Sequence, residues 1–98
     1  MILRVYGTAE TMHPGHARWE EFGGLLPAPL GARQYFLLDV DLVQTSCGYG
    51  VPYFEFREDR NTLTNWTEKK GEDGIRQYWA DMNRKSIDGY PTGIFDSE

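Results

Sequence analysis

Cysteine is almost absent from this chain of 98 residues, which has one, Cys47. A single thiol excludes an internal disulfide, so the fold depends on noncovalent packing. The chain also lacks an apolar run of about 18 residues, the length needed to cross a membrane, and a leader of the kind that directs secretion. These absences predict a soluble, cytoplasmic protein.

Basic residues are too few and too scattered for nucleic-acid binding. Ten Lys and Arg stand against fifteen Asp and Glu, which gives a formal charge of −5. No run of Lys or Arg is long enough to follow a phosphate backbone. We therefore expect neither a nucleic acid nor a membrane as a partner.

Histidine is scarce as well, because the chain has only His13 and His16. The intervening Pro14-Gly15 prevents the regular helical spacing of a metal-binding pair, and no cluster of Cys or carboxylates would complete a site. We therefore predict no metal.

What the chain does contain is the composition of a globular protein. Its residues are 40% hydrophobic, 14% aromatic and 26% charged, which is too apolar for a disordered chain. At this length a second independent core is not expected, so residues 1–98 are predicted to form a single domain.

Two segments show the two-residue alternation of β-strands. Residues 2–9 are expected to bury one face, consisting of Leu3, Val5, Gly7 and Ala9. Residues 33–45 show the clearest alternation, with an apolar face of Phe36, Leu38, Val40 and Leu42. A shorter aromatic run, residues 53–56, is a third predicted strand.

Helical patterns surround these strands. A short segment around Trp19 and Phe22, one turn apart, should end at Gly23-Gly24. Residues 62–70 predict a helix with Asn61 as its N-cap and Gly71 as its stop. A second helix carries Ile75, Tyr78, Trp79 and Met82 at three- and four-residue spacing and should end near Ser86.

Together these patterns predict an α+β fold of antiparallel strands with two C-terminal helices. So few strands cannot close a barrel by themselves, and a small sheet leaves its edges exposed.

The segment with the most chemical character is Gln44–Pro52. A strand that runs into small residues and glycines exposes backbone N–H groups and hydroxyls to an anionic or planar ligand. A tight turn, in which the glycines only supply positive φ, is the commoner structure for such a sequence. The residues alone favour the turn and leave the ligand loop open.

Other reactive side chains have simpler interpretations. Cys47 would need a neighbouring base to act as a nucleophile, and no pattern places a histidine beside it, so a structural thiol is favoured. Asp39 and Asp41 fit the solvated side of a strand better than a catalytic pair. Isolated arginines can clamp a phosphate but are usually surface residues; they include Arg57, Arg60 and Arg84.

Three segments carry a resemblance: Ile2–Ala9 (ILRVYGTA), Val43–Pro52 (VQTSCGYGVP) and Asn83–Gly93 (NRKSIDGYPTG). Together they resemble the pyridoxamine 5′-phosphate oxidase-like, FMN-binding split-barrel family. Their order and spacing are similar to the second half of longer members, so the resemblance covers nearly the whole chain.

The resemblance implies a split β-barrel, of which this chain would form the C-terminal half. It also implies a homodimer that holds FMN at the subunit interface and acts as an oxidoreductase on a small molecule, with the flavin transferring electrons and the protein orienting it. It names no catalytic acid or base. The residues that the resemblance implies for contact with the cofactor or the subunit interface are Gln44, Thr45, Ser46, Cys47, Gly48, Tyr49 and Gly50.

The strands that precede Ile2 in that family are absent from this sequence, so two alternatives stay open. One is a truncated, non-catalytic assembly module that lacks the flavin site and pairs its sheet edges with another chain. The other is a gene fragment without a function of its own, which predicts molten behaviour.

Overall fold

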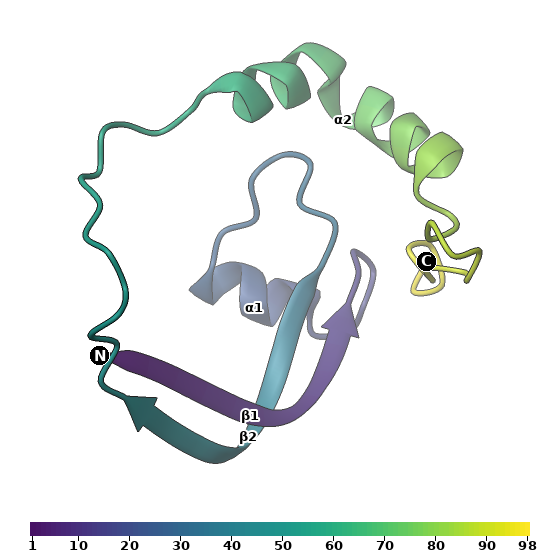
Figure 1. Ribbon diagram of the computed structural model, residues 1–98. Helices are drawn as coiled ribbons and strands as arrows, with labels where there is room; N and C mark the ends of the chain where they lie inside the picture. The colour runs from purple at the N-terminus through teal and green to yellow at the C-terminus, as the bar shows by residue number, and fades with distance from the viewer. The chain divides into compact units, whose positions relative to one another are not determined.

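The computed structural model describes residues 1–98 and has four elements in chain order (Figure 1). They are β1 (Ile2–Met12), α1 (Trp19–Leu25), β2 (Tyr35–Ser46) and α2 (Thr62–Met82). The chain divides into two compact units, described separately below. The sheet unit comprises Met1–Thr11 and Phe36–Asp59, and the helical unit comprises Met12–Tyr35 and Arg60–Glu98.

The sheet unit is built on one antiparallel pair of strands, β1 and β2 (Figure 1). The predicted α+β class and antiparallel strands are confirmed. The predicted split barrel is not confirmed, because the two-stranded sheet is not closed. Residues 53–56 form no strand, and that prediction was wrong. A strand needs a partner for its backbone N–H and C=O groups, and β1 and β2 pair only with each other.

The strands do not bury the apolar faces that their alternation predicts. Two strands cannot cover their own faces, and nothing else in this unit is a helix or a strand that could do so. The prediction of a buried face was therefore wrong for this chain by itself. The exposed apolar side chains include Leu3, Val5, Phe36, Leu38, Val40, Leu42 and Val43.

Gly7 of β1 lies against the backbone of β2. A Cβ atom at this position would lie 1.9 Å from the carbonyl oxygen of Asp39 and 3.1 Å from the Cα atom of Val40. Only glycine lets the two backbones approach so closely.

In the helical unit, α1 continues through the two glycines that were predicted to stop it, and it ends at Leu25. Glycine weakens a helix by about 1 kcal/mol, a cost that packing can offset. Tyr35 supplies such packing, with its ring centroid 4.6 Å from that of Trp19 and 6.4 Å from that of Phe22.

The long helix α2 is two helical segments joined at Gly71, whose φ of 67° and ψ of 174° are not helical. The predicted break is thus confirmed. Asn61 holds the N-cap position, although its side chain makes no capping hydrogen bond. The helix ends at Met82, before the predicted Ser86, because a small hairpin closed by a bridge between Lys85 and Pro91 follows.

The core of the helical unit is thin. Its buried apolar side chains are Met12, Ile75 and Ile94, accompanied by the buried Thr67, whose hydroxyl donates to the carbonyl oxygen of Thr64 at 2.9 Å. None of the helices has both the length and the apolar character that a membrane span requires.

Candidate functional site

The residues predicted to contact a cofactor lie at the end of β2 and in the loop that follows it. Gln44, Thr45 and Ser46 are the last residues of the strand. The next residues form a turn in which the Val51 N–H donates to the carbonyl oxygen of Gly48 at 3.0 Å. Gly48 has a φ of 67°, so glycine does supply a positive φ here, as the turn interpretation required.

The turn packs against the beginning of β1. A Cβ atom on Gly48 would lie 3.2 Å from the Cγ1 atom of Ile2, whereas one on Gly50 would meet nothing within 4 Å. The two glycines therefore differ: the positive φ of Gly48 favours glycine and its surroundings are tight, whereas Gly50 has neither constraint.

An open depression of about 570 Å³, the strand-end depression, lies beside this turn. Of the seven predicted contact residues, Gly48 and Tyr49 line it, and the other five do not. No Lys, Arg, His, Asp or Glu side chain lines it, so its side-chain walls are mainly apolar and aromatic. Its remaining walls are Met1, Ile2, Val51, Pro52 and Tyr53.

Two neighbouring side chains of the predicted set differ in exposure. The Ser46 hydroxyl oxygen is buried and has no hydrogen-bond partner, an uncommon state for a polar atom. Cys47 is a free, exposed thiol. It is therefore not a buried packing residue, although nothing in the sheet unit supplies a histidine to activate it.

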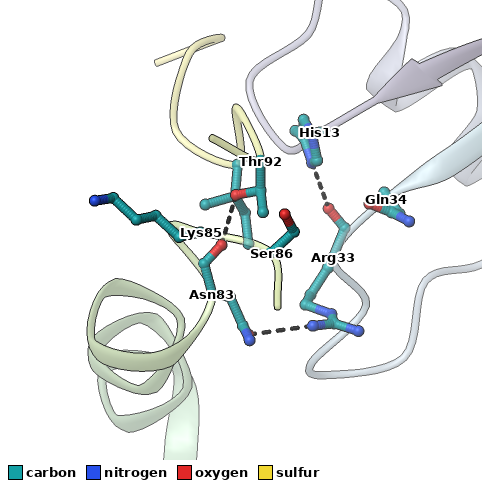
Figure 2. A pocket seen from close by; sticks show the side chains of 8 residues that line it. His13, Arg33, Gln34, Asn83, Lys85, Ser86 and Thr92 are labelled. Carbon is teal, nitrogen blue, oxygen red and sulfur yellow. Dashed lines mark hydrogen bonds between the residues drawn. The ribbon is translucent and has the colours of Figure 1, made fainter. Parts of the chain in front are cut away.

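A second hollow, the Arg33 cavity, lies within the helical unit and measures about 260 Å³ (Figure 2). Its wall combines His13, Arg33 and Gln34 with Asn83 beyond the end of α2. The hairpin that follows contributes Lys85, Ser86, Thr92 and Ile94. No sequence pattern predicted this site, and Arg33 is not one of the arginines considered above for phosphate binding.

The hairpin belongs to the third segment of the family resemblance, Asn83–Gly93. Its turn contains Gly89 at a φ of 88°, and the Ser86 N–H donates to the carbonyl oxygen of Tyr90 at 2.8 Å. Asp88 and Gly89 thus lie in the turn of this hairpin. In the sequence, this segment was notable only for its family resemblance. That resemblance was the one sequence signal that could have located the cavity.

The two histidines have separate hydrogen-bond partners. His13 Nδ1 donates to the carbonyl oxygen of Arg33 at 3.2 Å, and His16 Nδ1 accepts from the Arg18 N–H at 3.1 Å. No group of three or more His, Cys, Asp or Glu side chains is arranged to hold a metal ion.

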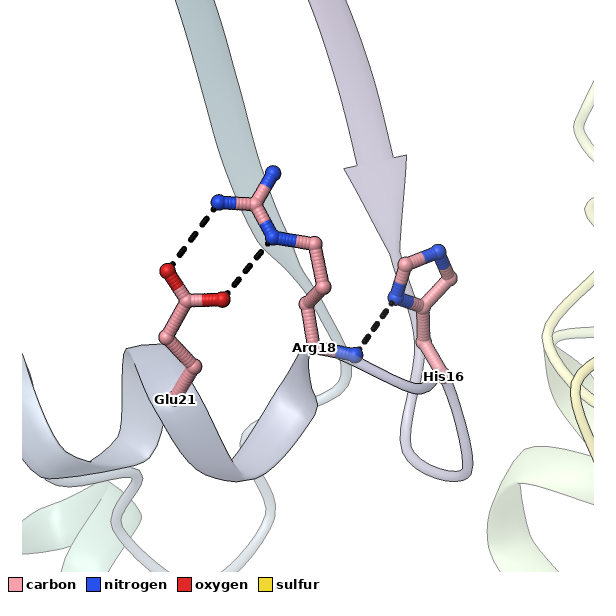
Figure 3. A network of polar contacts seen from close by, with 3 residues as sticks. All are labelled: His16, Arg18 and Glu21. Carbon is pink, nitrogen blue, oxygen red and sulfur yellow. Dashed lines mark hydrogen bonds and ion pairs between the residues drawn. The ribbon is translucent and has the colours of Figure 1, made fainter.

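Arg18 also forms a two-point ion pair with Glu21 (Figure 3). Its Nε and Nη2 atoms donate to the two carboxylate oxygens at 2.9 and 3.1 Å, and these hydrogen bonds lower the pKa of the Glu21 carboxyl below its ordinary value of 4.5. Both side chains are largely exposed, so the pair is a minor source of stability.

The Glu21 pair has a definite pH dependence. Because its pKa is lowered in the folded protein, its contribution to stability is complete above about pH 4.5 and disappears as pH falls through the folded pKa. In a carboxyl NMR titration, Arg18→Gln is expected to raise the Glu21 midpoint toward 4.5. An unchanged midpoint would contradict the ion pair, and Glu20→Gln is the matched control because it leaves the pair intact.

With this geometry established, comparison with known proteins decides the family. The chain is 34% identical, over an alignment of 108 positions, to pyridoxamine 5′-phosphate oxidase family protein ustO of Aspergillus flavus. The alignment covers 92% of this chain. This match confirms the resemblance to the pyridoxamine 5′-phosphate oxidase family.

Only part of the relative corresponds to the present chain, which spans 42% of its length. No family model matches the chain, and no solved structure matches it. The relationship to the pyridoxamine 5′-phosphate oxidase family therefore rests on sequence similarity. That similarity extends over nearly all of this chain but over less than half of the relative.

Proposed function

We propose that this chain is an FMN-binding protein of the pyridoxamine 5′-phosphate oxidase-like family that supports oxidoreductase chemistry on a small molecule. The observation that carries the proposal is the turn at the end of β2. It falls on the most specific segment of the resemblance and lies beside a depression partly walled by Tyr49 and Tyr53.

The residues present fit one part of the cofactor. A flat isoalloxazine ring suits the aromatic wall that Tyr49 and Tyr53 give to the depression, whereas the buried Ser46 hydroxyl does not line it. When bound, FMN would supply the electron-accepting ring of the reaction. The chain would position that ring through Gly48 and Tyr49 of the turn and hold it against Tyr53.

The phosphate of FMN needs cationic partners, and no Lys, Arg or His side chain lines the strand-end depression. A second copy of the chain would provide further walls, and the uncovered apolar faces of β1 and β2 would form the contact between copies. A homodimer with flavin at its interface is therefore part of the proposal. Burial of the exposed Val5, Phe36 and Val40 would drive this association.

The proposal is tested by mixing the purified chain with FMN and separating unbound flavin on a sizing column. We expect the visible flavin absorbance to elute with protein at the size of a dimer. Colourless, folded protein under these conditions would refute flavin binding by this chain.

Two glycine variants test whether the turn takes part. Gly48→Ala introduces a side chain at a φ of 67°, a strain of about 1–2 kcal/mol, and is expected to reduce flavin retention. Gly50→Ala is the matched control and is expected to retain flavin fully, because the added methyl group meets open space. Equal retention by both variants would exclude the turn from the site.

A second function, a non-catalytic assembly module, is favoured by the exposure of the sheet. Two paired strands with uncovered apolar side chains and free edges are suited to adding a strand from another chain. A colourless but stable oligomer in the same column experiment would favour this function over flavin binding.

A further inference from the structure

The Arg33 cavity differs in charge from the rest of the protein. The chain carries fifteen acidic and ten basic residues, yet no carboxylate lines this cavity. Its wall includes one arginine, one lysine and one histidine. An acidic protein thus has a hollow whose formal charge is positive, which attracts anions.

Arg33 is held in place by its neighbours on both sides. His13 fixes its backbone through the carbonyl oxygen, and the Arg33 Nη1 donates to Asn83 Oδ1 at 3.2 Å. An amide oxygen is neutral, so it orients the guanidinium without cancelling its charge. The remaining N–H groups of Arg33 can therefore bind an anion in the two-point manner that guanidinium favours.

The hairpin side of the cavity is also ordered by hydrogen bonds. The Thr92 hydroxyl donates to the carbonyl oxygen of Asn83, and the Ser86 hydroxyl donates to Asp88 and accepts from the Tyr90 N–H. Since these hydroxyl protons are engaged, Arg33 must supply the principal donors, assisted by the amide groups of Gln34 and Asn83. Lys85 extends away from the cavity and adds only longer-range charge (Figure 2).

An apolar groove of about 490 Å³ adjoins this cavity and shares Arg33 and Asn83 with it. Trp66 and Tyr78 line the groove in an edge-to-face pair with ring centroids 5.1 Å apart, and Trp79 lines it as well. A flat apolar group fits such a wall. The two hollows together therefore suit a molecule with one charged and one apolar end.

We propose that the Arg33 cavity binds the anionic group, phosphate or carboxylate, of a small molecule whose flat apolar part lies in the adjoining Trp66–Tyr78 groove. The site lies wholly within the helical unit and does not depend on flavin binding at the end of β2. The two proposals can therefore fail independently.

The test is an amide NMR titration of the whole chain with phenyl phosphate, benzoate and inorganic phosphate. Saturable shifts are expected at Arg33, Gln34, Asn83 and Ser86, with phenyl phosphate binding more tightly than inorganic phosphate because only the former reaches the groove. Comparing phenyl phosphate with benzoate identifies which anion the site prefers. Absence of saturable shifts at these residues for all three probes would overturn the proposal.

Two charge-removing variants sharpen the test. Arg33→Gln is expected to weaken phenyl phosphate binding roughly tenfold or more, as loss of a charge-assisted hydrogen bond implies, while Arg33→Lys is expected to restore part of it. Arg60→Gln removes the same charge in the same unit from a residue that lines neither hollow, and it is expected to bind normally. Equal losses from Arg33→Gln and Arg60→Gln would show nonspecific charge attraction and contradict the site.

The flavin experiment is run on the same variants. We expect Arg33→Gln to retain flavin as the unaltered chain does, because the strand-end depression contains no part of the Arg33 cavity. If Arg33→Gln loses flavin together with phenyl phosphate, the cavity serves the cofactor phosphate and the separate small-molecule site is refuted.

Discussion

Gly7→Ala is expected to separate β1 from β2 and to lower the free energy of unfolding of the sheet unit by about 3 kcal/mol or more. The new methyl carbon would lie 1.9 Å from the carbonyl oxygen of Asp39, and the obstructing atom belongs to the backbone. Rotation of a side chain cannot relieve this overlap, so the strands themselves must move apart. Faster amide hydrogen exchange along both strands would report the change.

Gly24→Ala is the control for this experiment. Gly24 lies in α1, where an added Cβ atom meets nothing within 4 Å, so alanine is expected to stabilise the helix by about 0.5–1 kcal/mol. If Gly7→Ala left strand exchange unchanged, the close approach of the two strands would be contradicted.

The second large effect is expected in the core of the helical unit. Ile75 is 3% exposed, and Ile75→Ala should cost about 2–5 kcal/mol because it removes apolar contact and leaves a cavity. Since the buried apolar side chains are so few, the neighbouring groups have little other packing to compensate. Thermal unfolding followed by circular dichroism at a helical wavelength would measure the loss.

Ile87→Ala makes the same chemical change at a fully exposed position in the hairpin. Its effect is expected to stay within about 0.5 kcal/mol, as for most surface substitutions. Equal effects at the two positions would show that Ile75 is not a core residue. That result would contradict the packing of α2 described above.

Local patterns predicted most elements of this protein correctly. The alternation over residues 33–45 located β2, and Asn61 and Gly71 marked the beginning and the interruption of α2. These features depend on the backbone preferences of a few neighbouring residues, which a sequence shows directly.

The errors arose where a prediction depended on a distant partner. Residues 53–56 have the aromatic composition of a strand but pair with no other strand. Gly23-Gly24 was expected to stop α1, but the helix continues, with the ring of Tyr35 packed against Trp19 and Phe22. Local propensity was therefore not enough for residues 53–56, which lack a partner strand, and packing outweighed it in α1.

The candidate sites show the same division. The sequence pointed to residues 44–50, and the turn at their end has the positive φ that Gly48 was expected to provide. It did not indicate Arg33, because a single arginine at the start of a predicted strand has no distinguishing pattern. Arg33 acquires its importance only through Asn83, which is 50 residues away in the chain.

The sequence by itself therefore determined the α+β class, the two strands, the kinked helix and the family resemblance, because each depends on short segments of neighbouring residues. Only the tertiary structure decided which faces stay exposed, where Gly7 is indispensable and how Arg33 comes to face the hairpin. Those properties are distances between residues far apart in the chain, and they exist only once the backbone has folded.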